Sequence, residues 1–389
     1  MEWKEVDICQ LCDSVSETYK GNASEVVLIN TSDVLDGKCL NHEYVPNKKL
    51  KGQFKKTFRK GDILYSEIRP ANKRFCFVDF EPKDYIASTK LMVLRAHEDV
   101  DPQYLYQILR SNDTLTQLQM LAESRSGTFP QITYSELSNI MVSLPSQKAQ
   151  KNIVSILSSL DRKIELNNKI NADLEEMAQA IFKNWFVDFE PFKDGKFVDS
   201  ELGMIPEGWK VGGLFDIAEI FDKKRKPLSG NVREKMDKIY PYYGATSCMD
   251  YVDDYIFDGI YTLIGEDGSV VKENGLPYMQ YVWGKMWVNN HAHILQGKNG
   301  YSTEMIHALL SITNIKFLVT GAVQAKLSQG NMQKILVAIP PKNVLDEIRP
   351  VIDNLYSKIR INTDENSRLS TLRDTLLPRL MSGELEVPE

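Results

Sequence analysis

Two stretches of the chain, about 147–186 and about 342–382, carry a stripe of mostly hydrophobic residues whose steps alternate between four and three. In the first stretch the stripe comprises residues 153, 157, 160, 164, 167, 171, 174, 178 and 181, and the second stretch keeps the same spacing. This alternation keeps the side chains on one helix face and is typical of a coiled coil. We therefore expect two long helices that pair through these faces. A helical hairpin that only stabilises the fold is the simpler alternative.

Asparagine interrupts the stripe in both predicted helices, at Asn167, Asn171, Asn362 and Asn366. A buried asparagine costs stability and usually fixes the register or orientation of paired helices. If a pseudo-two-fold axis relates the helices, they run antiparallel. Asn167 then faces Asn366, and Asn171 faces Asn362.

The helical pattern belongs to an internal repeat. Residues 140–145 (IMVSLP) match residues 335–340 (ILVAIP), and a helical pattern follows each at the same offset of 195. Towards the N-terminus the two halves align more loosely, with an offset of 206 near Trp3 and of 200 near Leu109. Small insertions of this kind belong in surface loops. The two copies therefore share a scaffold and differ in what that scaffold carries.

The rest of each half mixes strand and helix signals, which indicates an α+β fold. Short β-branched and aromatic runs, such as 62–65 and 260–263, predict strands, and helices are expected near 102–110 and 303–310. We predict two mixed α/β domains separated by a long antiparallel two-helix coiled coil. The expected boundaries are 1–145 for the first domain, 146–190 for the first long helix, 200–340 for the second domain and 342–382 for the second long helix.

Composition places the chain among ordinary globular proteins, with 389 residues, 42% hydrophobic content and a net charge of -6. Its five cysteines are odd in number and irregularly spaced, which favours a reducing compartment, and we expect the cytoplasm. The start has no cationic segment followed by an apolar run, and no stretch approaches the ~18 apolar residues of a membrane span. Seven basic and no acidic residues occur between 46 and 60, and residues 223–226 read KKRK, so basic patches lie on an acidic background.

Several motifs resemble those of specificity subunits of type I restriction-modification enzymes, the HsdS family. Residues 157–167 (LSSLDRKIELN), 174–179 (LEEMAQ) and 183–189 (KNWFVDF) resemble the central conserved region of that family. Residues 202–209 (LGMIPEGW) resemble the start of its second target-recognition domain, and 240–246, 254–259 and 263–269 resemble a target-recognition core. The resemblance covers the whole chain. In the first domain residues 67–70 (EIRP) stand where the second has 264–268 (IGEDG), which makes its loops harder to place.

The resemblance implies a sequence-specific DNA-binding subunit for a bipartite, asymmetric target, with one half recognised by each domain. Helices of this length would span about 60 Å at ~1.5 Å per residue, more than the ~34 Å of one DNA turn, and would set the spacer between the halves. The family docks two modification subunits, which methylate adenine with S-adenosylmethionine, and recruits ATP- and Mg²⁺-dependent restriction subunits. The chain itself would then bind no cofactor. A scaffold or adaptor without DNA sequence specificity is the alternative.

Loops rich in Arg, Lys, Asn, Gln, Ser and Thr are the candidates for DNA contact, because base-edge hydrogen bonds specify sequence and phosphate contacts position the protein. In the first domain these are Lys48, Lys49, Lys55, Lys56, Arg69, Asn72, Lys73, Arg74, Ser88, Thr89, Arg125, Ser126, Thr128 and Gln131, with Lys90 in the turn 88–90. In the second they are Lys223, Lys224, Arg225, Lys226, Thr246, Ser247, Ser269, Asn289, Asn290, His291, Gln324 and Lys326, with Asp267 in the segment 267–269. Any one of them alone is more often a solvated surface residue.

Catalytic and metal-binding signatures are not evident. The chain has no GxxxxGK[ST], no Rossmann glycine fingerprint and no Asn-Pro-Pro-aromatic motif, so we predict no catalytic residue. Cys9 and Cys12 form a lone CxxC without a second pair, so we expect them to face the core rather than bind zinc. His291 and His293 alternate on a predicted strand but lack a third ligand, and we expect them to face the core or DNA.

Overall fold

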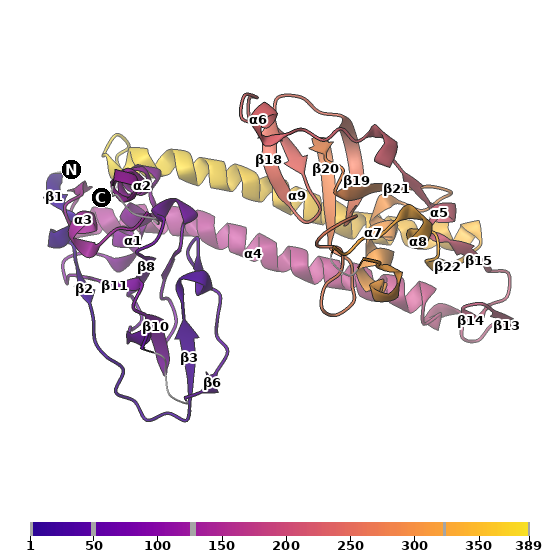
Figure 1. Cartoon of the computed structure of the whole chain (residues 1–389), viewed down its shortest axis with the longest axis horizontal. Helices are drawn as coiled ribbons and strands as arrows, with labels where there is room; N and C mark the ends of the chain where they lie inside the picture. The colour runs from indigo at the N-terminus through magenta and orange to yellow at the C-terminus, as the bar shows by residue number, and fades with distance from the viewer. Residues whose placement is uncertain (1–2, 48–51, 125–129, 322–323, 388–389) are drawn as a thin grey trace. The chain divides into compact units, whose positions relative to one another are not determined.

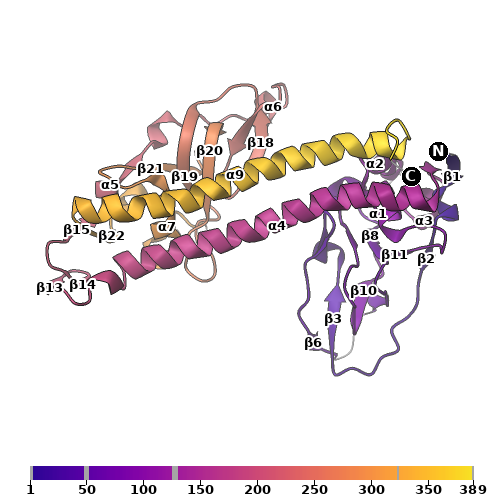
Figure 2. The ribbon, with the colours of Figure 1, turned by 180° about the vertical axis from the view of Figure 1, so that it is seen from behind.

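The structure is a computed structural model, and it describes residues 3–47, 52–124, 130–321 and 324–387. The chain divides into two compact units, unit 1 (Met1–Glu165 with Asn366–Glu389) and unit 2 (Leu166–Glu365). The predicted long helices are present as α4, Gln147–Phe186, and α9, Lys342–Met381, and each unit contains part of both. Within each unit the two helices lie side by side (Figures 1 and 2). None of the helices in the described ranges combines the length and hydropathy of a membrane span.

In its described residues, unit 1 has two four-stranded sheets and two strand pairs. The strands are β1 (Lys4–Asp7), β2 (Cys12–Val15), β3 (Glu25–Ile29), β4 (Val34–Leu35), β5 (Lys38–Cys39), β6 (Val45–Pro46), β7 (Phe54–Lys56), β8 (Ile63–Ser66), β9 (Phe75–Phe77), β10 (Tyr85–Ser88), β11 (Leu91–Ala96) and β12 (Met141–Leu144). The helices are α1 (Pro102–Arg110), α2 (Asn112–Ser124) and α3 (Tyr134–Ser138), with 3-10 turns at Ile8–Gln10, Thr31–Asp33 and Pro70–Asn72. The sheets run β6-β3-β10-β7 and β2-β11-β8-β9, while β1 pairs with β12 and β4 with β5.

The central strands of unit 1 bury both faces. In β8, Ile63 and Tyr65 pack into a core that includes residues of α1 and α4, whereas Leu64 packs into the core shared with β3 and β10. In β11, Met92 packs into the first of these cores and Val93 packs into the second. Successive side chains of a strand point to opposite faces, so one strand can serve two cores. This explains why these strands read as continuous apolar runs.

Unit 2 is built around one six-stranded sheet in its described residues, in the order β16-β21-β19-β20-β17-β18. The strands are β13 (Phe197–Ser200), β14 (Gly203–Pro206), β15 (Lys210–Gly213), β16 (Ala218–Ile220), β17 (Tyr240–Tyr243), β18 (Cys248–Val252), β19 (Phe257–Gly265), β20 (Met279–Val288), β21 (Ala292–Gly297) and β22 (Leu336–Ile339). The helices are α5 (Leu214–Ile217), α6 (Gly230–Arg233), α7 (Thr303–Ile312) and α8 (Gln329–Met332), with 3-10 turns at Glu190–Phe192, Asp222–Lys224 and Lys316–Leu318. Two pairs, β13-β14 and β15-β22, complete the unit.

The same alternation builds the cores of unit 2. Ile264 of β19 and Leu295 of β21 pack against α7 and against the parts of α4 and α9 that belong to this unit. Leu263 and Ile294, one position earlier in each strand, face the opposite core. The strands predicted at 260–263 and the helix predicted near 303–310 are thereby confirmed.

Equivalent strand pairs in the two units confirm the internal repeat. The antiparallel pair β1-β12 aligns Lys4 with Leu144, and the antiparallel pair β15-β22 aligns Lys210 with Ile339. The first residues of these pairs are 206 positions apart, and the second residues are 195 apart, as the two sequence offsets require. Each pair leads directly into a long helix.

In unit 2 the long helices run antiparallel and pair through polar side chains. The amide of Asn362 donates a hydrogen bond of 2.8 Å to Oδ1 of Asn171, whose own amide donates to Oγ1 of Thr363 at 3.1 Å. Four residues earlier on α4, the buried Asn167 donates to the carboxylate of Glu365 at 2.8 Å. The predicted pairing of Asn171 with Asn362 is confirmed, and it fixes the register of this part of the helix pair.

Asn366 is also buried, but it belongs to unit 1, so its predicted pairing with Asn167 stays a prediction. The helices of unit 1 are joined instead by a charged group. Asp161 of α4 accepts a hydrogen bond from Arg373 of α9 at 2.7 Å and another from Arg110 of α1 at 2.9 Å. The carboxylate therefore ties the helix pair to the mixed α/β part of unit 1.

Asn171→Ala should destabilise unit 2, because it leaves the amide of Asn362 without its acceptor inside the helix pair. We expect a loss of about 1–3 kcal/mol in the free energy of unfolding, measured by urea denaturation. The double change to alanine at Asn171 and Asn362 removes both polar groups and should cost less than the sum of the two single changes to alanine. Glu176→Ala, on an exposed position of α4, is the matched control. Additive single effects would contradict the pairing.

Candidate nucleic-acid interface

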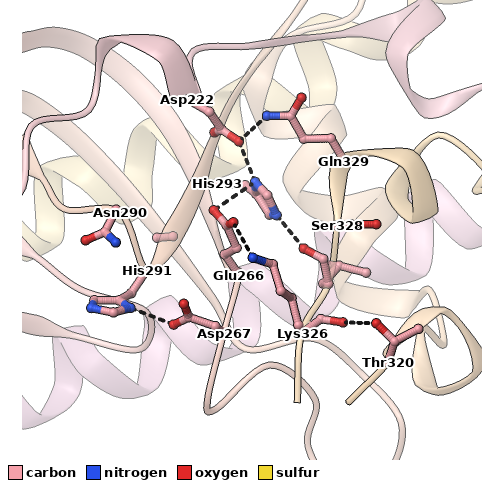
Figure 3. Close-up of polar contacts among 12 residues, drawn as sticks. Asp222, Glu266, Asp267, Asn290, His291, His293, Thr320, Lys326, Ser328 and Gln329 are labelled. Atoms are coloured by element: carbon pink, nitrogen blue, oxygen red, sulfur yellow. Dashed lines mark hydrogen bonds and ion pairs between the residues drawn. The ribbon is translucent and has the colours of Figure 1, made fainter. Parts of the chain in front are cut away.

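Four segments that carry predicted DNA contacts come together in unit 2: residues 244–247, 265–269, 289–291 and 324–327. The main chain of Glu266 joins three of them, because its N–H donates to the carbonyl of His291 and its carbonyl accepts from the N–H of Leu327, both at 2.8 Å. The fourth segment lies beside them, since a Cβ on Gly265 would be 3.6 Å from the carbonyl oxygen of Ala245. An isolated antiparallel bridge between Asp267 and Lys326 links two of these segments a second time. Figure 3 shows both residues.

Unit 1 carries the same main-chain arrangement on different residues. The N–H of Glu67 donates to the carbonyl of Lys90 at 3.1 Å, and the N–H of Ile132 donates to the carbonyl of Glu67 at 2.8 Å. Ile68 pairs with Gln131 as an isolated bridge, just as Asp267 pairs with Lys326 in unit 2. Glu67 therefore takes the place of Glu266, and Lys90 that of His291. The sequence motifs alone did not place these loops of the first domain.

The signal that sequence reasoning missed is a glutamate directly after a central strand in each half. Glu67 follows β8, which ends at Ser66, and Glu266 follows β19, which ends at Gly265. The motifs around them differ, and neither glutamate is among the predicted DNA contacts. Their shared role lies in the main chain, which a comparison of side chains does not reveal.

We call the two sets of loops the loop clusters. The cluster of unit 2 contains the predicted residues Thr246, Ser247, Ser269, Asn290, His291, Gln324 and Lys326, all of them exposed. The cluster of unit 1 contains Arg69, Thr89 and Gln131, with Asn72 and Lys73 exposed next to Arg69. Lys55 of unit 1 and Lys223, Lys224 and Lys226 of unit 2 are exposed as well. Lys48, Lys49, Arg125, Ser126 and Thr128 lie outside the described residues.

Five predicted DNA contacts are instead committed to the protein itself. Ser88 and Asn289 are buried, and each accepts a hydrogen bond from the main chain two residues further on. Arg74 donates to the main-chain carbonyls of Ser32 and Val34, and Lys56 donates to the carbonyls on both sides of Lys90. Burial lowers the pKa of Lys56, as its half-buried position requires. These contacts favour structural roles over contact with DNA.

Arg225 is the fifth of these residues, and its side chain binds two segments of the loop cluster of unit 2. Its Nη1 donates to the carboxylate of Glu266 at 2.6 Å and to the carbonyls of Asn290 and Ala292 at 3.2 and 2.8 Å. Its Nε donates to the carbonyl of Asp222 at 3.0 Å. The side chain is only 12% exposed, and its hydrogen bonds are made to acceptors of the protein itself. The neighbouring lysines, in contrast, are exposed.

His293 completes this buried network (Figure 3). Its Nδ1 lies 2.5 Å from Oδ2 of Asp222, and its Nε2 lies 2.7 Å from the carbonyl oxygen of Leu327. Both partners are hydrogen-bond acceptors, so each ring nitrogen of His293 faces an acceptor. Burial alone would raise the pKa of Asp222, but the hydrogen bond from His293 and the charge of Arg225 outweigh it and lower the pKa. Gln329 donates to the same carboxylate at 2.6 Å.

The two histidines of the predicted strand lie in different environments. His291 and His293 do not share a face, because His291 is exposed before β21 while His293 is buried within it. His293, Asp222 and Glu266 lie within 4.8 Å of one another, but the guanidinium of Arg225 already contacts both carboxylates. We therefore describe this group as an ion-pair network.

The CxxC pair is divided between surface and core, whereas the sequence predicted that both cysteines face the core. Cys9 is exposed and Cys12 is buried. Burial raises the pKa of the Cys12 thiol to about 12, so it stays protonated at neutral pH. The thiol donates to the carbonyl of Ile8 within its own unit.

Arg225→Ala should destabilise unit 2 strongly, because it leaves the buried carboxylate of Asp222 and the partly buried carboxylate of Glu266 without the guanidinium that they share. Removing one member of a buried ion pair costs about 3–5 kcal/mol, and we expect a loss of that order in the free energy of unfolding. Tryptophan fluorescence in urea is a suitable measurement, since Trp185, Trp209, Trp283 and Trp287 belong to unit 2. Lys223→Ala, two residues away and exposed, is the control. Equal effects of the two changes would contradict the network.

The stability of unit 2 should also fall in acid because of Asp222. A carboxylate whose pKa is lowered below 3.8 in the folded state stabilises that state above this value, and the stabilisation is lost as the pH falls through the folded-state pKa. We expect the urea midpoint to decrease between pH ~4 and pH ~2. Asp222→Asn cannot ionise, so its midpoint should be lower at neutral pH and less dependent on pH in this range. Parallel profiles for the two proteins would rule out this contribution.

Comparison with known proteins identifies the repeat. The family model of the type I restriction modification DNA specificity domain matches residues 2–176 and 206–371, which are the two halves of the chain. A type I restriction enzyme HindI specificity subunit from Haemophilus influenzae is 31% identical, over 99% of this chain and 100% of the relative. The MjaIX specificity subunit from Methanocaldococcus jannaschii is 27% identical, over 90% of this chain and 85% of the relative.

A solved structure supports the fold. The S subunit of a type I restriction-modification system from M. genitalium aligns with a TM-score of 0.55 and 16% identity, covering 100% of this chain and 97% of that one. The match of the family model to both halves and the 31% identity over nearly the full length establish the family. The chain therefore belongs to the type I restriction-modification DNA specificity family, with two copies of the specificity domain.

Proposed function

We propose that this chain is the DNA specificity subunit of a type I restriction-modification complex and that each loop cluster contacts one half of a bipartite, asymmetric DNA target. The chain itself catalyses no step in this proposal. It directs the modification and restriction subunits to the sequence that its two units recognise.

The duplicated loop cluster is the observation that carries the proposal. Each unit ties three loops together through the main chain of one glutamate, Glu67 or Glu266, yet presents different side chains on the same framework. Ile68 stands where unit 2 has Asp267, and Lys90 stands where it has His291. A shared framework with different hydrogen-bonding groups suits recognition of two unlike base sequences, because base edges are distinguished by donor and acceptor pattern.

Local charge supports contact with DNA despite the net charge of -6. Three exposed lysines, Lys223, Lys224 and Lys226, flank Arg225, which itself holds the loop cluster of unit 2. Lys326 lies within that cluster, and its Nζ is 3.5 Å from Oε1 of Glu266. Lysines in such positions neutralise phosphates and give binding that weakens with salt.

The partners in this proposal are double-stranded DNA, two modification subunits and the ATP-dependent restriction subunits. The repeated strand pair and helix of the two units offer equivalent surfaces, which suits two copies of one partner. S-adenosylmethionine, ATP and Mg²⁺ would bind those subunits rather than this chain.

Mapping of methylated adenines tests the proposal. The chain is produced with its modification subunits in cells that lack other adenine methylation, and the methylated sequence motif is determined from the genomic DNA. We expect a two-part motif. Lys326→Ala should relax or alter one part, and Lys90→Ala should relax or alter only the other, because the two residues belong to different loop clusters.

A salt titration of binding to the mapped target gives a second measurement. Loss of one phosphate contact should lower the slope of log K against log salt by about one. A scaffold without sequence specificity would bind the mapped target and a shuffled duplex with the same affinity. That result, or a motif unchanged in both variants, would refute the proposal.

A further inference from the structure

His291 is the one ionisable side chain of the segment 289–291, and its imidazole is 46% exposed beside the Asp267 carboxylate. We propose that His291 recognises a base edge through its Nε2 atom and that Asp267 holds the ring in the tautomer this requires. The inference rests on the proposed function of the loop cluster and assigns a specificity-determining residue and a positioning residue within it.

The contact with Asp267 decides which nitrogen carries the proton. Nδ1 of His291 lies 2.6 Å from Oδ1 of Asp267, and an ionised carboxylate can only accept. Nδ1 therefore donates, and in the neutral ring Nε2 is left as an acceptor, with no hydrogen bond to it from the residues that the structure describes. Figure 3 shows this second nitrogen on the side of the ring turned away from Asp267.

The backbone of His291 is held on both sides, so the ring is presented in a defined place. Its N–H donates to the side chain of Asn289 at 2.8 Å, and its carbonyl accepts from Glu266 at 2.8 Å. Arg225 donates to the carbonyls of Asn290 and Ala292, the residues on either side. Groups fixed before binding lose less conformational entropy on contact, which favours recognition by a single hydrogen bond.

An acceptor at Nε2 selects among the bases. In the major groove, adenine presents its N6 amino group and cytosine its N4 amino group as donors, whereas guanine and thymine present acceptors at the corresponding places. Nε2 of His291 would accept from adenine or cytosine and would meet an unsatisfied acceptor on guanine or thymine. The exposed amide of Asn290 next to it can satisfy a neighbouring base edge.

His97 of unit 1 provides a built-in contrast. It also contacts an aspartate, with Nε2 3.2 Å from Oδ2 of Asp13, but its Nδ1 lies 3.0 Å from the carbonyl oxygen of Gln10. Both ring nitrogens of His97 are therefore engaged by protein groups, and the ring offers nothing to a ligand. His97→Ala is the matched control for His291→Ala.

The first test measures binding of the full chain, assembled with its modification subunits, to the target selected from a library of random duplexes. Every adenine of that target is replaced in turn by purine, which lacks the N6 amino group, and every cytosine by 2-pyrimidinone, which lacks the N4 amino group. One replacement should weaken binding about three- to tenfold in the unchanged protein, the effect of one lost hydrogen bond. In His291→Ala the same replacement should have no further effect.

His291→Asn guards against a loss of folding, because its amide can still donate to Asp267 while the group at the Nε2 position is gone. We expect it to bind like His291→Ala at that one base and like the unchanged protein elsewhere. His97→Ala should leave the effect of every base replacement on binding unchanged. If His291→Ala leaves every replacement effect intact, the inference fails although the proposed function stands. If no duplex is selected at all, the proposed function fails.

The second test concerns Asp267 and is spectroscopic. The chain has five histidines, and all of them are labelled with ¹⁵N. The signals of His291 are those that are lost in His291→Asn. We expect a protonated Nδ1 and an unprotonated Nε2 in the unchanged protein, and averaged signals from both tautomers in Asp267→Ala. Base discrimination at the His291 position should shrink in that variant, whereas Glu273→Ala, which removes an exposed carboxylate nearby in the sequence, should change neither measurement. The opposite tautomer in the unchanged protein would overturn the inference.

Discussion

Each loop cluster depends on the main chain of one glutamate, Glu67 in unit 1 and Glu266 in unit 2. Glu266 uses its N–H for one loop and its carbonyl for another, and Glu67 does the same in unit 1. A buried main-chain group without a partner costs free energy, so these bonds hold the loops together whatever side chains they carry. The side chains of the loops are therefore free to differ between units without loss of the framework, which is what two unlike recognition surfaces require.

In unit 2 a buried layer of charge supports this framework. Arg225 and the imidazole of His293 face the carboxylates of Asp222 and Glu266, and the guanidinium of Arg225 pairs with both carboxylates. Such a network adds little net stability, but it is strongly destabilising to break, because the remaining charges are then buried alone. Its value here is geometric, since Arg225 also fixes two carbonyls of the segment that carries His291.

The elements that the sequence predicts correctly depend on short-range periodicity. The long helices follow from their spacing, and the pairing of Asn171 with Asn362 follows from that spacing combined with the repeat. The convergence of the loops could not be predicted in the same way, because it joins residues as far apart as Glu266 and Leu327. The basic run at 223–226 shows the limit most clearly. These four basic residues divide into three exposed lysines and one partly buried arginine, and the acidic groups that contact the arginine lie elsewhere in unit 2.

Unit 1 is discontinuous in the chain, and this affects how it folds during synthesis. Its core draws on Ile153 and Leu157 of α4 and on Leu377 and Leu380 of α9, with all of unit 2 in between. Unit 2 is continuous and can fold as soon as Glu365 has left the ribosome. The part of unit 1 that precedes unit 2 is made before it, but Leu377 and Leu380 of α9, which pack into its core, are made only after unit 2. Of the two units, the one whose synthesis begins earlier is thus the one completed later.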